Sequence, residues 1–176
     1  DRMRNVITTT AFLLENFKTN IIIKEVDKES VFKKEALPII EDIIDVNIWE
    51  NFNFIFEESD EPLFHRQRVL NEMIHVTETP IVVNYDCDVI LPKKSYEIAY
   101  KSILEGDTDV VYPYGQGMYQ KQVAATDEVV SSFLETGDYN HLDCVSNIHT
   151  SDFGWAQFFR TSVYKEGGME NENFKA

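Results

Sequence analysis

Cysteine is scarce in this chain: Cys87 and Cys144 are its 2 cysteines, too few for a disulfide framework. This scarcity predicts a reducing, cytoplasmic compartment. Long apolar runs are missing too, since none approaches the roughly 20 residues that a membrane-spanning helix needs. The polar start at residues 1–4 is unlike a signal peptide. Because residue 1 is Asp rather than Met, we expect the chain to be a piece of a longer protein.

Basic residues are also few, with 16 Lys and Arg against 31 Asp and Glu and a formal net charge of −15. So acidic a chain is a poor partner for nucleic acid or for an anionic membrane surface. Any membrane association is therefore expected through other parts of the full-length protein. The 176 residues are 43% hydrophobic and 12% aromatic, which favours one folded domain with a sizeable core over disorder.

Apolar segments with the period of a strand alternate along the chain with segments of helical period. Strands are expected at 21–26, 52–57, 80–85, 110–112 and 153–159, and helices at 2–17, 37–46, 64–77, 95–104, 127–134 and 162–167. This alternation predicts an α/β fold with a mostly parallel, doubly wound sheet. Such sheets start on a strand whereas this chain starts on a helix, so we expect a leading strand before residue 1.

An acidic triplet, Asp86-Cys87-Asp88, directly follows the apolar strand at 80–85. In open α/β sheets, ligands bind outside the carboxyl ends of the strands. Two carboxylates there suit Mg²⁺ or Mn²⁺ that also binds substrate phosphates and water. A second triplet, Asp107-Thr108-Asp109, precedes its strand and therefore predicts a solvated turn at the opposite edge.

A second candidate site is the start of the helix at 64–77, which reads Phe64-His65-Arg66-Gln67-Arg68. Free N–H groups at a helix N-terminus, together with Arg66 and Arg68, predict an anion site. Phe64 offers a flat face for a base. Two alternatives remain open here: Phe64 as a hydrophobic staple and Arg68 as an ion-pair partner of Glu72. For His65 we expect a solvated or helix-capping role rather than metal binding.

Read together, these segments resemble the nucleotide-sugar core of GT-A-fold glycosyltransferases, of the bacterial family-two and animal galactosyltransferase types. The resemblance rests on 64–71, with its aromatic-x-Arg and Leu-Asn, and on 84–92, where Asp-x-Asp leads into a Pro. It extends to 22–29 and, near the end, to 155–160 and 167–174. It therefore covers most of the chain in the order of the family.

The resemblance implies a role for each matching residue. Asp88, helped by Asp86, would hold Mn²⁺ or Mg²⁺ against the diphosphate, and Asp86 would also approach the ribose or sugar. The other implied contacts to the UDP-sugar come from Phe64 and Arg66 at the uracil and phosphate side, from Glu25 or Asp27 at the base or ribose, and from Gln157 and Gly167-Gly168 at the sugar pocket.

The resemblance also implies how the single domain is divided: residues 1–114 would form the nucleotide-sugar-binding half, and 115–176 a partial acceptor-side half. Transfer in this group usually inverts the sugar linkage, with a carboxylate base that the family places just beyond the position of Ala176. The catalytic base is therefore expected outside this chain. Glu170 and Glu172 are expected to be surface residues of a loop.

The leading hypothesis is thus an enzyme of polysaccharide biosynthesis that moves a hexose or N-acetylhexosamine from a UDP-sugar to a glycan or lipid-linked sugar. One alternative is a related nucleotidyltransferase, although that class has a Gly-rich, Lys-bearing loop and the 7 glycines here form no such cluster. Another is a non-catalytic sugar- or partner-binding domain. Asp86, Asp88 and Arg66 argue against such a decayed site.

Overall fold

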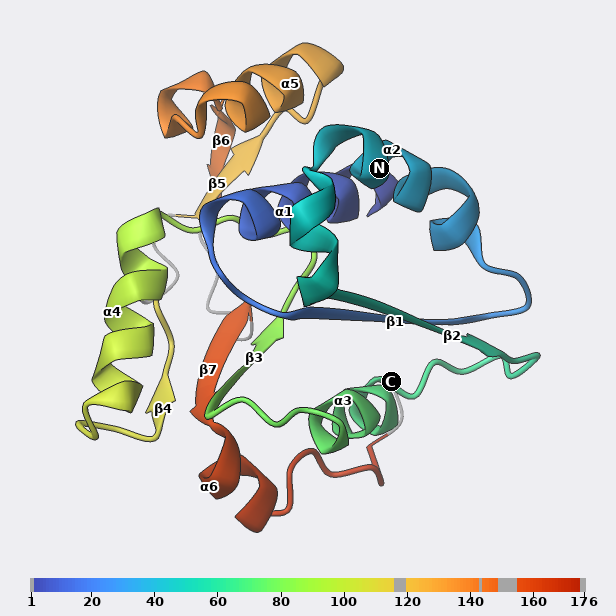
Figure 1. Ribbon diagram of the computed structural model, residues 1–176, viewed down its shortest axis with the longest axis vertical. Helices are drawn as coiled ribbons and strands as arrows, with labels where there is room; N and C mark the ends of the chain where they lie inside the picture. The colour runs from blue at the N-terminus through green and yellow to red at the C-terminus, as the bar shows by residue number, and fades with distance from the viewer. Residues whose placement is uncertain (1, 116–119, 143, 149–154, 175–176) are drawn as a thin grey trace.

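The strands form three small sheets in the structure, a computed structural model that describes residues 2–115, 120–142, 144–148 and 155–174 (Figure 1). In the first sheet, β1 (Ile21–Asp27) pairs in parallel with β2 (Phe52–Glu58). In the second, β7 (Ala156–Arg160) lies between β3 (Ile81–Tyr85) and β4 (Val110–Val111) and is antiparallel to both. The third pairs β5 (Gln120–Val123) with β6 (Cys144–Ile148), also antiparallel.

The predicted mostly parallel, doubly wound sheet is therefore wrong, although the chain is α/β. Within the described residues, β1 and β2 make the one parallel pair, and the three-stranded sheet is antiparallel throughout. The cause is β7, which comes late in the chain and inserts between β3 and β4. Alternation of helices and strands predicts parallel neighbours, but it does not tell into which gap, or in which direction, a later strand enters.

The helices lie close to their expected positions. α2 (Leu37–Ile43) begins at Leu37 with Pro38 in its first turn, after a π-helical turn at Phe32–Ala36. The remaining helices are α1 (Arg2–Asn16), α3 (Arg66–His75), α4 (Lys93–Leu104), α5 (Asp127–Thr136) and α6 (Thr161–Glu166), with 3₁₀ turns at Val46–Asn51 and Tyr139–His141. Strands β5 and β6 were not predicted. Part of the strand expected at 153–159 falls outside the described residues.

Helix α1 contributes side chains to two hydrophobic clusters. Its Phe12 belongs to a cluster that we call the sheet core, with Leu91, Tyr96, Ala99, Ile103, Phe133, Ala156 and Phe158. Its Ile7, Ala11 and Leu14 belong to the helical core, with Phe32, Ala36, Ile40 and Ile44. Phe12 stacks on Phe133 of α5 at 5.4 Å between ring centroids. Helix α2 lies beside α1 (Figure 1), and its Ile40 is fully buried.

The two edge strands of the three-stranded sheet begin in the same way. Ile81 of β3 and Val110 of β4 each open a pairing with β7 in which their own N–H and C=O point away from β7, as the flanking bonds Thr161 N–Pro80 O and Arg160 N–Asp109 O require. In both strands a threonine two residues earlier covers the outward carbonyl. Thr79 Oγ1 donates to Ile81 O at 3.0 Å, and Thr108 Oγ1 donates to Val110 O at 3.1 Å.

Candidate functional site

Asp86 directly follows the last residue of β3, Tyr85, and its backbone still pairs with the residue that precedes β7. Its N–H donates to Trp155 O at 2.8 Å, and its carbonyl accepts from Val89 N at 3.3 Å, which turns the chain out of the sheet. Asn84, two residues earlier, lies directly opposite Gln157 of β7. Directly opposite residues of two strands share a face of the sheet. The predicted residues Asp86 and Gln157 are therefore neighbours at one end of this sheet.

Arg66, the first residue of α3, contacts Asp86. Its guanidinium donates to Asp86 Oδ1 at 2.9 Å, with the two side chains 49% and 37% exposed. Burial raises the pKa of the Asp86 carboxyl, and the nearby Asp88 adds to this effect, while Arg66 opposes it. The structure thus joins the helix start and the acidic triplet, which lie apart in the sequence, in one site.

Asp86 and Asp88 form a pair of hard oxygen ligands, and Asp88 is exposed to solvent. Among the described residues, no group of three or more His, Cys, Asp and Glu side chains is placed to hold a metal ion. Two carboxylate groups are the kind of ligand that Mg²⁺ or Mn²⁺ takes together with phosphate and water oxygens. The second triplet is a turn as predicted, and its Asp109 pairs with Arg160 at 2.6 Å.

A pocket of about 220 Å³ lies between the end of β1, the loop at 59–65 and the start of α3. We call it the β1–α3 pocket. Its lining includes the predicted residues Asp27 and Phe64, and also Ser59, His65 and Arg68. Phe64 is 49% exposed, so its ring offers a free apolar surface there. Arg66, which contacts Asp86, follows Phe64 by two positions in the chain but does not itself line the pocket.

Glu25 does not line this pocket. Its carboxylate accepts hydrogen bonds from Ser30 Oγ at 2.6 Å and from the N–H groups of Val31 and Phe32 at 3.0 and 2.9 Å. These are the free N–H groups at the start of the π-helical turn. Of the two acidic residues predicted near a base or ribose, Asp27 is therefore the one that lines the pocket, whereas Glu25 caps a helix.

Arg68 is held in a network of four charges. It donates to Glu57 at 2.8 Å and to Glu72 at 2.7 Å, and both carboxylates also bind Lys24, whose side chain is 9% exposed. Hydrogen bonds from Arg68 and Lys24 lower the pKa of Glu57 to about 2. Two cations matched by two anions leave no net charge, so the alternative for Arg68 is confirmed and its predicted anion role is not supported. The cation available to an anion at this helix start is Arg66.

His65 occupies the N-cap position of α3, but its side chain makes no capping hydrogen bond. Its Nε2 lies 3.8 Å from Glu61 instead. The expected capping role is therefore not seen, and the side chain, 19% exposed, is not a freely solvated one either.

A polar network, which the sequence did not indicate, lies beneath Asp86. It joins Asn71 of α3, Asn84 of β3, Tyr164 of α6 and the glutamates of the final segment, Glu170 and Glu172. Asn71 and Asn84 are each 4% exposed. Glu170 lies in the final loop as expected but is half-buried, and its carboxylate accepts hydrogen bonds from Tyr164 and Asn84. Glu172 is exposed as expected, and its carboxylate accepts from Asn71 at 2.8 Å.

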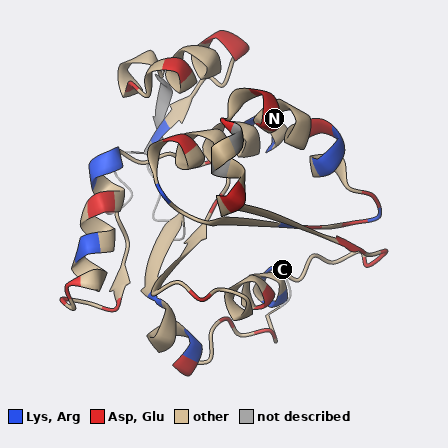
Figure 2. Ribbon diagram, in the orientation of Figure 1, with Lys and Arg blue, Asp and Glu red and all other residues tan. Residues whose placement is uncertain are grey.

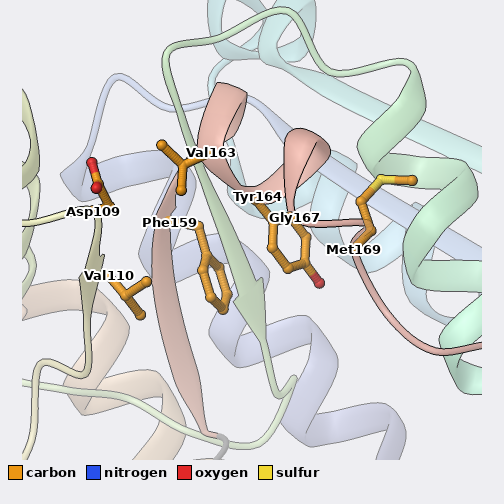
Figure 3. Close-up of a pocket in the computed structure, with 7 residues that line it drawn as sticks. All are labelled: Asp109, Val110, Phe159, Val163, Tyr164, Gly167 and Met169. Carbon is orange, nitrogen blue, oxygen red and sulfur yellow. The ribbon is translucent and has the colours of Figure 1, made fainter.

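Tyr164 also borders a second pocket, of about 160 Å³, between β4 and α6. Figure 3 shows Tyr164 beside Phe159 in its lining, and the two rings stack at 4.4 Å. Burial, followed by the hydrogen bond to Glu170, raises the pKa of the Tyr164 hydroxyl. The hydroxyl therefore stays protonated and serves as a donor to Glu170. Acidic residues lie on most of the helices in view (Figure 2).

Comparison of the chain with protein-family models, with curated proteins and with solved structures finds no match. Within the described part of the chain, no helix has the length and apolar character needed to span a membrane.

Proposed function

We propose that this chain is the donor-binding part of a metal-dependent glycosyltransferase that uses a UDP-sugar. The observation that supports this most strongly is the contact of Arg66 with Asp86 at 2.9 Å. It joins the two segments on which the family resemblance mainly rests. The segment that leads into α3 and Arg66 also carries Phe64, whose exposed ring lines a pocket together with Asp27.

In this proposal the uracil occupies the β1–α3 pocket, with Phe64 against its face and Asp27 accepting a hydrogen bond from the base or ribose. Arg66 releases Asp86 and binds a phosphate oxygen, as a guanidinium favours. Asp86 and Asp88 hold the divalent cation, and Gln157 contacts the sugar. When bound, the cation neutralises the diphosphate and stabilises it as a leaving group.

The finer features of the proposal come from the resemblance alone. The sugar is a hexose or N-acetylhexosamine, the acceptor is a glycan or lipid-linked sugar in the cytoplasm, and the linkage is inverted. The resemblance implies a catalytic base beyond Ala176, and we assign none among the described residues. The carboxylate of Glu170, which is near that end, already accepts hydrogen bonds from two donors.

Calorimetry with UDP, with and without Mn²⁺, tests the proposal. We expect UDP binding that depends on Mn²⁺ and that Asp88→Ala abolishes, because the remaining Asp86 alone cannot hold the metal against the diphosphate. Asp109→Ala is the matched control, since it removes an aspartate of the other Asp-x-Asp triplet, whose partner is Arg160. Binding that needs no metal, or that Asp88→Ala leaves unchanged, contradicts the proposal.

A further inference from the structure

Helix α3 is fastened to β3 at two levels. The first is the exposed ion pair of Arg66 with Asp86. The second is buried and runs through Glu170: Asn71 accepts from Glu170 N and donates to Glu170 O, each at 2.9 Å. The carboxylate of Glu170 in turn accepts from Asn84 Nδ2 at 3.3 Å. The backbone of Glu170 thus binds the helix while its side chain binds the strand.

The chain makes an unusual turn to bring Glu170 into this position. Helix α6 ends in a Schellman motif, in which Met169 N donates to Tyr164 O and Gly168 N to Lys165 O. Gly168 has φ 93° and Met169 has φ 58°, so two consecutive residues are left-handed. A side chain such as that of Met169 rarely adopts this conformation, and it persists where surrounding contacts enforce it. The reversal returns the chain to α3, where its described end lies (Figure 1).

Tyr164 completes the second level. Its hydroxyl donates to Glu170 Oε1 at 2.6 Å and accepts from Asn84 Nδ2 at 3.0 Å. The two acceptors of Asn84 Nδ2, the Tyr164 hydroxyl and Glu170 Oε1, therefore lie side by side and share its amide donor group. Asn84 precedes Asp86 by two residues on β3, so the two side chains point to the same face of the strand.

We propose that Glu170 is a positioning residue of the UDP-sugar site, which holds the start of α3 at a fixed distance from Asp86. The inference rests on the proposed function. When a metal and a diphosphate engage Asp86 and Arg66, their ion pair opens, and the first level is lost. The second level remains, because no substrate contact uses Asn71, Asn84 or Tyr164. It keeps Phe64 and Asp86 at a fixed distance and orientation, which a site that must orient its substrate requires.

Glu170→Ala and Glu170→Gln test this role. Glu170→Ala removes both acceptor bonds, and we expect UDP binding with Mn²⁺ to weaken about 10-fold, as for other residues that orient metal ligands. In the absence of any ligand, we expect faster amide hydrogen exchange in the first turn of α3 and at 84–86. Glu170→Gln keeps an oxygen that accepts from Tyr164 and Asn84, so we expect affinity within about 2-fold of the parent chain and unchanged exchange.

Glu166→Ala, at the exposed end of α6, is the control and should leave both readouts unchanged. If Glu170→Ala does not fold, Tyr164→Phe decides the matter, because it deletes the donor hydroxyl and keeps the ring on Phe159. A folded Glu170→Ala with parent exchange and parent affinity overturns the positioning role. If the parent chain fails to bind UDP with Mn²⁺, the proposed function falls, and the exchange measurement still decides whether Glu170 fixes α3 to β3.

Discussion

Arg66 and Arg68 are two positions apart on one helix, yet their surroundings give them different chemistry. Arg68 is matched by Glu57 and Glu72, whereas Arg66 has one exposed partner, Asp86. An exposed ion pair contributes about 1 kcal/mol or less, so an incoming phosphate can replace Asp86 at little cost. The sequence pattern indicated both arginines as candidates. Their roles differ because Arg68 pairs with Glu57 of β2, whereas Arg66 pairs with Asp86 at the end of β3.

The low pKa of Glu57 predicts how the stability of the chain depends on pH. A carboxyl with a pKa of about 2 in the folded chain and near 4.5 otherwise stabilises the fold above about pH 4.5. This contribution is lost as the pH falls toward about 2. We expect Glu57→Gln to lower the free energy of unfolding by about 1 kcal/mol at pH 7 and to make no difference near pH 2.

Urea unfolding across this pH range measures the effect. Glu58→Gln is the control, since Glu58 is the exposed neighbour on β2 and makes no ion pair within the described residues. Equal pH profiles for Glu57→Gln and the parent chain would show that the network does not stabilise the fold.

Phe64 carries the prediction for base binding. Stacking of a base on an aromatic ring contributes about 1–3 kcal/mol, so we expect Phe64→Ala to weaken UDP binding about 5- to 160-fold. The side chain is 49% exposed, and the melting temperature should therefore change little. Phe174→Ala, at a phenylalanine that is 68% exposed and lines neither pocket, should leave UDP affinity unchanged. Equal affinities for the two variants would remove Phe64 from the site.

At the scale of elements, the turns after α6 and after α4 each contain a glycine with positive φ, and the two form a matched pair for mutation. Gly168 has φ 93° and Gly106 has φ 88°, and a Cβ at either would meet no atom within 4 Å. The cost of alanine is therefore one of backbone conformation, about 1–2 kcal/mol at both positions. We expect Gly168→Ala and Gly106→Ala to lose similar stability in urea unfolding. Only Gly168→Ala should weaken Mn²⁺-dependent UDP binding, because only Gly168 leads into Glu170.

The elements themselves were largely predictable from the sequence. Apolar periodicity indicates α1, α3 and β3, and Pro38 fixes where α2 begins. The short strands β5 and β6 were missed because a polar segment such as Gln120–Val123 carries no strand pattern and is paired by a distant segment. Of the candidate site, the sequence indicated Asp86, Asp88, Arg66, Phe64 and Asp27. It did not indicate Asn71, Asn84 or Tyr164, because hydrogen bonds between distant segments leave no local pattern.

At the scale of the whole molecule, the sheet order was beyond the reach of local patterns. β7 is the last strand and joins β3 and β4, so its register depends on contacts formed across about half of the chain. The composition did predict a sizeable core. It did not predict that this core is divided into two clusters that share α1.

The shared helix predicts cooperative unfolding. Of the 2 tryptophans, Trp49 packs on the helical core, and Trp155 contacts Tyr114 beside the sheet core. Chains that keep one tryptophan, Trp49→Phe and Trp155→Phe, should show coincident urea transitions because α1 couples the clusters. Leu14→Ala and Phe133→Ala, in different clusters, should each lower the free energy of unfolding by about 3–5 kcal/mol and move both signals together. Separate transitions would show two independent folding units.

The threonines that precede β3 and β4 have a consequence for how the protein behaves in a crowded solution. An open strand edge is a template on which another chain can add, and such growth leads to aggregation. Thr79 and Thr108 occupy the first outward carbonyl of each edge, so an incoming strand would have to displace a hydroxyl before its first bond could form. The first open position of each edge is in this sense already occupied by the turn that leads into the strand.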